Sequence, residues 1–311
     1  MKRLLLLLFL LGSLIQLFGE SAPPRDLEEK AFSGDAVSQN TLGIFYLENG
    51  DMDKALEWWQ KAANQGYVKA YTNLGSYYLM RNQKEAKYWY EKGAEHKDPL
   101  AYRGLAMYYD KFEHNTEETL KWYRMAANCG DTNSQRVLGF WHYRQGQYHT
   151  AISYFSPAVQ KGDELAQRGL ADSYYELKDY PNAFKWYVER ANHGDIESQN
   201  RLAYMYIYGQ GTDVDHKEGR YWMKRSAEGG NPIAQFNLGL FFSKGSIGLE
   251  QNEEKSFEWF KKAADQGYSE AMYNVGVYYY NHGERDKAFH WLSLAKEKGY
   301  ADAEKILNML R

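Results

Sequence analysis

The side chains that most often ligate metals or act as nucleophiles are sparse in this sequence. Its eight histidines are scattered, and none forms the His-Glu-x-x-His pattern or another short pair with the spacing of zinc ligands. Cys129 is the only cysteine, so no disulfide can form within the chain, and no paired histidine motif accompanies it. These residues predict no catalytic nucleophile, no metal site and no bound cofactor.

A glycine-rich stretch, "GQGTDVDHKEG" from Gly209 to Gly219, has some features of a phosphate-binding or calcium-binding loop. It lacks the lysine spacing of a Walker loop, and Asp213 and Asp215 lack the glutamate at the distal position of an EF-hand. Adjacent carboxylates such as Glu253 and Glu254 fall in predicted first turns of helices, where the helix dipole favours them. We therefore interpret these residues as turns and helix starts.

A row of arginines and aromatic residues is the remaining candidate for function. Arg103, Arg136 and Arg168 recur at intervals of 33 and 32 residues. Arginine beside exposed rings is typical of protein-binding hot spots, and guanidinium groups pair well with carboxylates. The predicted partner-binding residues are Arg103, Met107, Arg136, Phe140, Tyr143, Arg168, Tyr175, Tyr204, Phe236, Tyr273 and Tyr280. The alternative is that the arginines only solvate a helix face.

An internal repeat sets the positions of these residues. An apolar residue followed by Gly or Ala recurs eight times, with a small residue four positions before it and usually a Tyr four positions after it. This spacing marks one face of an α-helix, which we call the A helix of each unit. At about 100° per residue, the arginine row points away from that buried face. The apolar positions are Leu42, Leu74, Leu105, Leu138, Leu170, Leu202, Leu238 and Val275.

A second helix, the B helix, follows in each unit and carries a Trp or Tyr that we expect to fill the wedge between neighbouring units. These rings are Trp58, Trp89, Trp122, Tyr154, Trp186, Trp222, Trp259 and Trp291. A glycine closes the B helix in seven units, where a left-handed residue is easiest for glycine. In the second repeat Lys97 replaces this glycine, and we expect Asp98-Pro99 to end the helix there.

The connections between the A and B helices of the sixth and seventh repeats are longer and glycine-rich, whereas earlier ones are tight. After Gly299, the sequence "YADAEKILNMLR" predicts one terminal helix that covers the last unit. The predicted organisation is a signal peptide at 1–19, a linker and the start of the first helix at 20–35, eight repeats at 36–299 and a capping helix at 300–311.

The combination Ala-x-x-x-Leu-Gly-x-x-x-Tyr, a Gly-x-Gly turn at Gly209 and Gly211, Trp-Tyr, Ala-Ala and a closing Gly resembles the Sel1-like repeats, relatives of the tetratricopeptide repeats. The resemblance covers roughly residues 36–311. It implies an all-α solenoid of about eight helix-turn-helix repeats that form a right-handed superhelix. Units two to six have shorter turns, which are more typical of tetratricopeptide repeats. Cysteine-rich family members are linked to penicillin binding or β-lactam hydrolysis, but this sequence lacks their paired cysteines.

The N-terminus "MKRLLLLLFLLGSLIQLFGE" has the positive start, apolar stretch and small residue of a cleaved signal peptide. It predicts a bacterial periplasmic or secreted protein with no membrane span after cleavage. The formal net charge is −3 and becomes more negative without Lys2 and Arg3. Nucleic acid is therefore not expected as a partner, because phosphate binding needs a concentrated basic surface.

These observations predict an exported, non-enzymatic scaffold or adaptor that binds a protein or peptide on the concave face of the repeats. Sel1-like proteins as a class are associated with such adaptor roles and with host interaction. Three alternatives stay open at this point. The protein could be a periplasmic immunity protein that neutralises a secreted toxin, a hydrolase of the cell wall or of β-lactams, or a purely structural spacer.

Overall fold

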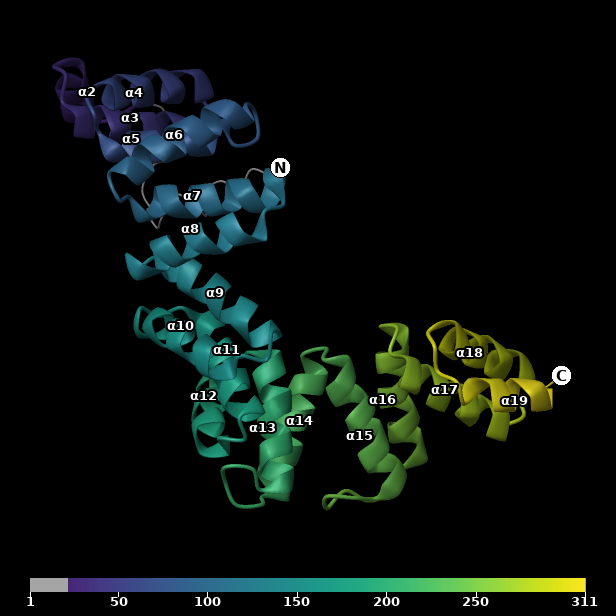
Figure 1. Ribbon diagram of the computed structural model, residues 1–311. Helices are drawn as coiled ribbons and strands as arrows, with labels where there is room; N and C mark the ends of the chain where they lie inside the picture. The colour runs from purple at the N-terminus through teal and green to yellow at the C-terminus, as the bar shows by residue number, and fades with distance from the viewer. Residues whose placement is uncertain (1–21, 311) are drawn as a thin grey trace. The chain divides into compact units, whose positions relative to one another are not determined.

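The computed structural model describes residues 22–310, which contain eighteen α-helices, one π-helical segment and no strand. The predicted signal peptide, residues 1–19, lies outside the described residues. The chain divides into two compact units, and Figure 1 labels their helices in chain order. The first unit contains the chain up to Gln145 together with Ser153–Asp163, and the second contains Gly146–Ile152 and the chain from Glu164 onward. The all-α prediction is confirmed.

The helices of the first unit form consecutive hairpins of an A helix and a B helix. The bounds are α2 Arg25–Phe32, α3 Ala36–Glu48, α4 Met52–Asn64, α5 Val68–Tyr78, α6 Gln83–Glu95, α7 Pro99–Tyr108, η1 Tyr109–Glu113, α8 Thr116–Asn128 and α9 Thr132–Arg144. Helix α10, Tyr148–Gln160, contributes its residues from Ser153 onward to this unit. The A helices here are α3, α5, α7 and α9.

The second unit continues the same alternation, with α11, α13, α15 and α17 as A helices. Its bounds are α11 Glu164–Glu176, α12 Tyr180–Asn192, α13 Ile196–Tyr208, α14 His216–Glu228, α15 Pro232–Lys244, α16 Glu253–Asp265, α17 Ser269–Asn281, α18 Arg285–Glu297 and α19 Ala303–Leu310. The predicted eight repeats are therefore present as eight helical pairs in residues 36–297.

The core of each repeat lies where the A helix meets its B helix. The predicted apolar positions of the A helices are buried, with Leu42, Leu74, Leu105, Leu138 and Leu202 at 0% exposure. The side chain that packs against the A-helix glycine is that of the residue after the predicted Trp or Tyr. Fully buried side chains at this following position are Trp59, Tyr90, Phe155, Tyr187, Met223 and Leu292. The side chain that fills the space beside the A-helix glycine is therefore one residue further along the B helix than the predicted ring.

The A-helix glycine is required by the close approach of this second ring. A Cβ atom added at Gly43 would lie 2.5 Å from Trp59, and one at Gly139 would lie 2.5 Å from Phe155. Such distances are shorter than van der Waals contact, so no larger residue fits unless the helices separate. The Leu-Gly pairs therefore mark the points where B-helix rings cross an A helix.

In seven repeats the B helix ends at the glycine that the sequence predicted. The seven closing glycines all have φ between 82° and 97°, as expected for a left-handed residue after a helix: Gly66, Gly130, Gly162, Gly194, Gly230, Gly267 and Gly299. Lys97 adopts the same left-handed conformation, with φ of 59°. Asp98 caps the next helix and Pro99 is its first residue, so Asp98-Pro99 start α7 while Lys97 closes the turn.

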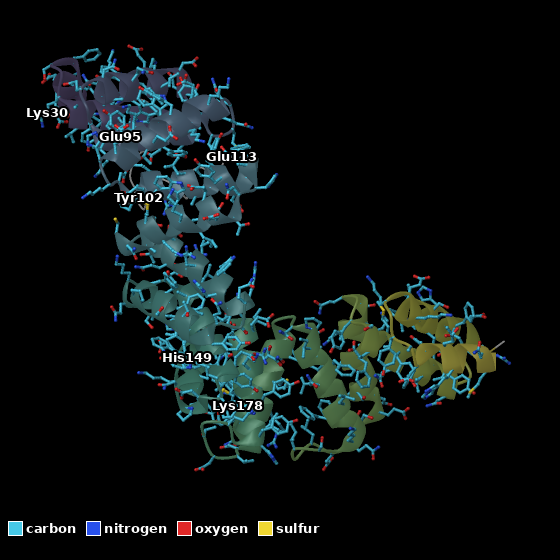
Figure 2. All side chains as sticks on the ribbon, in the orientation of Figure 1. Lys30, Glu95, Tyr102, Glu113, His149 and Lys178 are labelled. Atoms are coloured by element: carbon cyan, nitrogen blue, oxygen red, sulfur yellow. The ribbon has the colours of Figure 1, made fainter. Side chains whose placement is uncertain are left out.

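The third A helix ends in a π-helical segment that the repeat spacing did not predict. Tyr109–Glu113 forms η1, and His114 after it is left-handed, with φ of 49°. Lys87 of α6 donates a hydrogen bond to Glu113 at 3.0 Å, and Glu113 is labelled in Figure 2. This bond connects the extended end of the A helix to the preceding B helix.

Short helices cover the apolar surface at both ends of the repeats. Ala31 of α2 is buried, and Phe32 packs edge-on against Trp58 with ring centroids 5.1 Å apart. At the other end, Ala303 and Leu307 of α19 are buried in the core of the last repeat. The predicted terminal capping helix is confirmed. Within residues 22–310, none of the helices combines the length and apolar character needed to cross a bilayer.

Replacing Gly211 by alanine is expected to destabilise the second unit. Gly211 has φ of +74°, and an added Cβ would overlap the carbonyl of Tyr180, which is backbone and cannot rotate away. The left-handed conformation alone costs about 1–2 kcal/mol for alanine, and the overlap adds to it. Gly283→Ala is a matched control, because Gly283 has φ of +76° with open space around it. Urea denaturation should show a larger loss for Gly211→Ala; equal losses would contradict the overlap.

Candidate protein-binding surface

Arg103 is buried in the first unit and takes part in an inter-repeat ion pair. Its Nη1 lies 2.7 Å from Oδ1 of Asp131, and both side chains are less than one-tenth exposed. Asp131 is also the N-cap of α9, where it accepts a hydrogen bond from the backbone N–H of Ser134 at 2.8 Å. The guanidinium group is therefore occupied by a carboxylate of its own chain.

Arg136 repeats this arrangement one helix pair later in the same unit. Its Nε donates to Oδ2 of Asp163 at 3.0 Å, and its Nη2 donates to Oδ1 of Asn133 at 2.7 Å. About a quarter of its side chain is exposed. Arg103 and Arg136 thus each join an A helix to the aspartate before the next A helix.

Arg168 makes a looser version of the same pair in the second unit. Its Nη1 lies 3.7 Å from Oδ2 of Asp195, the N-cap residue of α13. The buried Arg190 also approaches Asp195, at 3.9 Å, and pairs with Glu164 at 3.1 Å. A sequence signal for this ladder exists, because an aspartate followed three residues later by serine or alanine comes 27 or 28 residues after each arginine.

The predicted apolar residues of the first unit are partly buried against neighbouring helices. Met107 packs at the edge of the cluster around Tyr90, and Phe140 packs edge-on against Phe155 with centroids 4.9 Å apart. Tyr143 is half-buried on α9. These side chains therefore share their surface between the core and solvent.

Three of the predicted aromatic residues of the second unit, Tyr204, Phe236 and Tyr273, each pack against another ring, and we call these three ring pairs the aromatic belt. It comprises Tyr204, Tyr208, Phe236, Tyr268, Tyr273 and Tyr300. Tyr204 stacks on Tyr208 with centroids 6.0 Å apart, and Asn237 of α15 donates a hydrogen bond to the Tyr204 hydroxyl.

The rest of the belt pairs one ring of α15 and one ring of α17 with rings that precede α17 and α19. Phe236 packs on Tyr268 at 5.2 Å, and Tyr273 packs on Tyr300 at 4.8 Å. Tyr280 lies on the same face of α17 as Tyr273 and is 38% exposed. Tyr208, which the sequence did not single out, is 63% exposed.

Tyr175 lies on α11 and is held by its own network. Its ring contacts Tyr180 and Tyr187 edge-on, at 5.4 and 6.3 Å, and its hydroxyl donates to Gln210 at 3.1 Å. The guanidinium carbon of Arg201 lies 5.4 Å from the centre of the Tyr175 ring. This contact places a cation at the same end of the unit as Tyr204.

Burial raises the pKa of Tyr204 to about 12, and the neighbouring phenols of Tyr208 and Tyr268 add to this shift. The Tyr204 phenol therefore stays protonated at physiological pH and can donate or accept a hydrogen bond. An aromatic surface with neutral hydroxyl groups is suited to apolar side chains and to the backbone amides of a peptide.

Replacing Asp172 by asparagine is expected to stabilise the second unit at neutral pH. Asp172 accepts a hydrogen bond from the Tyr187 hydroxyl at 2.6 Å, and burial raises its pKa although this bond lowers it. A raised carboxyl pKa means that ionisation costs native stability, and that cost disappears below the ordinary pKa. Thermal melts from pH 4 to pH 8 should show an advantage of Asp172→Asn that grows as pH rises. A variant that is less stable at pH 7 would contradict this.

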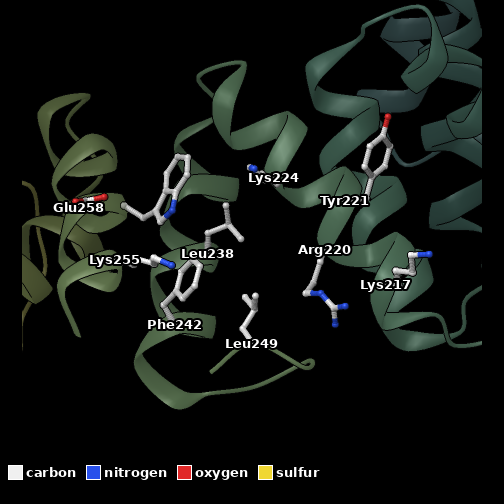
Figure 3. Close-up of a pocket in the computed structure, with 10 residues that line it drawn as sticks. Lys217, Arg220, Tyr221, Lys224, Leu238, Phe242, Leu249, Lys255 and Glu258 are labelled. Atoms are coloured by element: carbon white, nitrogen blue, oxygen red, sulfur yellow. The ribbon is translucent and has the colours of Figure 1, made fainter. Parts of the chain in front are cut away.

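A second surface, which the sequence did not predict, is a cleft of about 500 Å³ between α14 and α16 in the second unit (Figure 3). It is lined by Lys217, Arg220, Tyr221, Lys224, Leu238, Phe242, Leu249, Lys255, Glu258 and Trp259. The long connection after α15 and the cationic residues at i, i+3 and i+7 of α14 were the signals that could have indicated it. No group of three or more metal-ligating side chains occurs within residues 22–310.

Comparison with known families agrees with the observed repeats. Segments 36–67, 68–98, 99–131, 196–231, 232–268 and 269–300 match the Sel1 repeat, and 142–194 matches a tetratricopeptide repeat. Repeats two and three therefore match Sel1 repeats despite their short turns, and repeat six matches with its longer, glycine-rich connection. The tetratricopeptide-like section is narrower than the predicted units two to six.

Two solved structures are similar over nearly the whole chain. A protective antigen present in uropathogenic Escherichia coli strains, with an SLR fold, is 30% identical with a TM-score of 0.76, covering 93% of this chain and 67% of that one. A Sel1 repeat protein from Oxalobacter formigenes is 25% identical with a TM-score of 0.73, covering 99% and 93%.

Among curated proteins, a Sel1-like repeat-containing protein of Acanthamoeba polyphaga mimivirus is 34% identical over 128 residues, 39% of this chain. That match and one to an uncharacterised protein of Neisseria meningitidis span only 24% and 20% of the relatives' lengths. With six Sel1 repeats that together account for more than half of its residues, the chain belongs to the Sel1 repeat family.

Proposed function

We propose that the protein is an exported, non-enzymatic scaffold that binds a protein or peptide on the A-helix face of its second unit. Sel1 repeat proteins generally mediate protein–protein interactions, and such scaffolds are typically non-enzymatic. The observation that carries the proposal is the aromatic belt. Its rings Tyr204, Phe236 and Tyr273 are half-buried on the successive A helices α13, α15 and α17. Tyr208 of the belt and the nearby Tyr280 are exposed on α13 and α17.

The belt is suited to binding because its rings are held in place before a partner arrives. Tyr204 is fixed by stacking on Tyr208 and by the hydrogen bond from Asn237. Rigid aromatic side chains lose little conformational entropy on binding and are enriched at hot spots. The arginines have a different role in this proposal. Arg168 pairs with Asp195 and so supports the geometry of the face, with part of its guanidinium exposed at the edge.

Export through a cleaved signal peptide is part of the proposal. It rests on the composition of residues 1–19. N-terminal sequencing of the protein from a periplasmic fraction should begin at Glu20. Recovery of the intact Met1 terminus in the cytoplasm would contradict export.

The binding face can be tested by site-specific photo-crosslinking in the producing cell. A benzoylphenylalanine at Tyr280 should give a discrete adduct with a protein partner, and Tyr208→Ala should reduce its yield about tenfold, the effect of losing one hot-spot ring. Phe289 is the control position, because it is 46% exposed on the B helix α18 of the same unit. Equal adducts from both positions, or no adduct at Tyr280, would argue against the A-helix face.

The immunity protein, the hydrolase and the spacer remain alternatives without a supporting contact. The single thiol, Cys129, is free and exposed. Identification of the crosslinked partner would separate the readings, since a secreted toxin would indicate immunity and a cell-envelope protein would indicate an adaptor.

A further inference from the structure

The cleft between α14 and α16 has a layered construction. Its floor comes from the A helix α15, which contributes Leu238 and Phe242 from one face. Leu249, from the connection that follows, adds to the floor. Leu238 is 3% exposed, whereas Phe242 and Leu249 are half-buried. Apolar side chains at the base of a cleft of this volume are typical of ligand sites.

The walls of the cleft are mainly cationic. Lys217, Arg220 and Lys224 lie on one face of α14, and Lys255 lies on α16 beside Phe242 (Figure 3). Glu258 is the one carboxylate in the lining. Four cations against one anion contrast with the formal net charge of −3 for the whole chain. This local excess of positive charge attracts anionic groups.

The cations differ in how far they are already occupied. Arg220 donates a hydrogen bond to the carbonyl of Ile247 and so holds the connection that forms one side of the cleft. Lys224 makes only an exposed pair with Glu228, at 3.6 Å. Within residues 22–310, Lys217 and Lys255 have no carboxylate within ion-pair distance, and Lys255 lies 5.6 Å from the centre of the Phe242 ring. Two to three ammonium groups are therefore available to a ligand.

The connection after α15 is ordered by its own hydrogen bonds, which keeps the cleft open. The backbone N–H of Asn252 donates to the carbonyl of Phe242 at 2.8 Å, and the Gln251 side chain donates to the carbonyl of Ser243 at 3.0 Å. Together with the hydrogen bond from Arg220, these contacts fix the position of Leu249 in the floor of the cleft. The site is therefore preformed, which lowers the entropic cost of binding.

We propose that this cleft binds an acidic peptide segment with an aromatic or aliphatic anchor residue. The anchor lies on Leu238, Phe242 and Leu249, and flanking carboxylates pair with the lysines. Lys217 and Lys224 are seven residues apart on one helix, about 10.5 Å at 1.5 Å per residue. An extended peptide spans that distance with about three residues at ~3.4 Å each. The geometry therefore favours two acidic residues three positions apart, with the apolar anchor between them.

This site is independent of the aromatic belt, because its walls come from the B helices α14 and α16 rather than from the exposed side of the A helices. It goes beyond the proposed function by assigning the charge and spacing of a second ligand segment. Variants in the two places separate the two proposals, since Tyr208→Ala leaves the cleft unchanged and lysine reversals leave the belt unchanged.

The test is titration of the full chain with the peptide acetyl-Glu-Asp-Phe-Leu-Asp-Glu-amide, followed by the indole N–H signal of Trp259 in ¹⁵N-tryptophan-labelled protein. The Trp259→Phe variant assigns that signal. We expect saturable shifts with a Kd of about 10–300 µM, which is typical of a short charged peptide. Lys217→Glu and Lys255→Glu should each weaken binding about tenfold. Lys298→Glu, an exposed lysine outside the cleft, should change it by less than about twofold.

Two further ligands decide between specific and general attraction. A peptide with alanines in place of Phe and Leu should bind at least about tenfold more weakly, because the anchor burial is lost. No Trp259 shift up to about 2 mM peptide, or equal binding of the alanine peptide, would overturn the proposal. Binding of phosphatidylglycerol vesicles that depends on the same lysines, with no peptide binding, would also overturn it, in favour of a membrane surface.

Discussion

Replacing Tyr90 by alanine is expected to lower the free energy of unfolding of the first unit by about 3–5 kcal/mol, the range for truncating a fully buried aromatic residue. Tyr90 is 1% exposed. Its ring fills the space left by two glycines, because an added Cβ at Gly75 would lie 2.5 Å from it and one at Gly104 would overlap it. Alanine would leave a cavity between two A helices, which neither glycine can fill.

The hydroxyl of Tyr90 contributes less than its ring. It lies 3.2 Å from Oγ of Ser76 within the core. Tyr90→Phe should therefore cost only about 1 kcal/mol, the net value of one hydrogen bond. Tyr88→Ala on the same helix is the surface control, because Tyr88 is 48% exposed, and should cost less than about 1 kcal/mol.

Urea denaturation followed by circular dichroism measures these differences. Repeat arrays can unfold in segments, so hydrogen exchange of α5, α6 and α7 should accompany the melts. The loss of protection in Tyr90→Ala should centre on these helices. A cost for Tyr90→Ala as small as that for Tyr88→Ala would mean that the ring is not the wedge between these repeats.

Replacing Asp131 by alanine is expected to cost about 3–5 kcal/mol, because it removes the carboxylate that pairs with the buried guanidinium group of Arg103. The same change removes the N-cap of α9, which receives hydrogen bonds from the N–H and Oγ of Ser134 at 2.8 and 2.6 Å. Capping alone is worth about 1 kcal/mol. The main loss therefore comes from the ion pair, whose two side chains are 8% and 7% exposed.

Asp51→Ala isolates the capping contribution. Asp51 caps α4 in the same unit and pairs only with the exposed Lys54, at 2.8 Å. We expect its loss to cost about 1 kcal/mol. Adding Arg103→Met to Asp131→Ala should restore part of the stability, since it removes the buried charge that has lost the Asp131 carboxylate. If Asp131→Ala and Asp51→Ala have equal effects on the urea midpoint, the buried pair does not stabilise the junction between the third and fourth repeats.

The second prediction bears on function, because Arg103 is one of the residues that the sequence assigned to partner binding. Arg103 is committed to Asp131, so its guanidinium contributes to the alignment of successive A helices. The aromatic rings on the A helices of the second unit are more accessible to a partner, since Tyr208 and Tyr280 keep a large exposed fraction. Variants at exposed rings therefore test binding with little effect on folding, whereas variants at the arginines test folding first.

The sequence by itself determined the helices, the eight repeats and their ends. These features depend on local spacing, such as the apolar residue followed by glycine at Leu74-Gly75, and on local caps such as Gly66 with its φ of 82°. A helix period and a left-handed turn are set within four or five residues of chain. The sequence also determined the terminal helix, whose apolar face packs against the last repeat.

The tertiary structure decided which of two adjacent aromatic residues is buried, and it showed which of the charges spaced by about one repeat meet. Trp89 and Tyr90 both fit the pattern of a B helix, and the crossing of the helices selects Tyr90. The partner of Arg103 lies 28 residues along the chain, so helical periodicity does not identify it. The cleft between α14 and α16 depends likewise on the path of the connection through Leu249. Contacts between elements follow from packing angles and loop paths, which short-range sequence patterns do not encode.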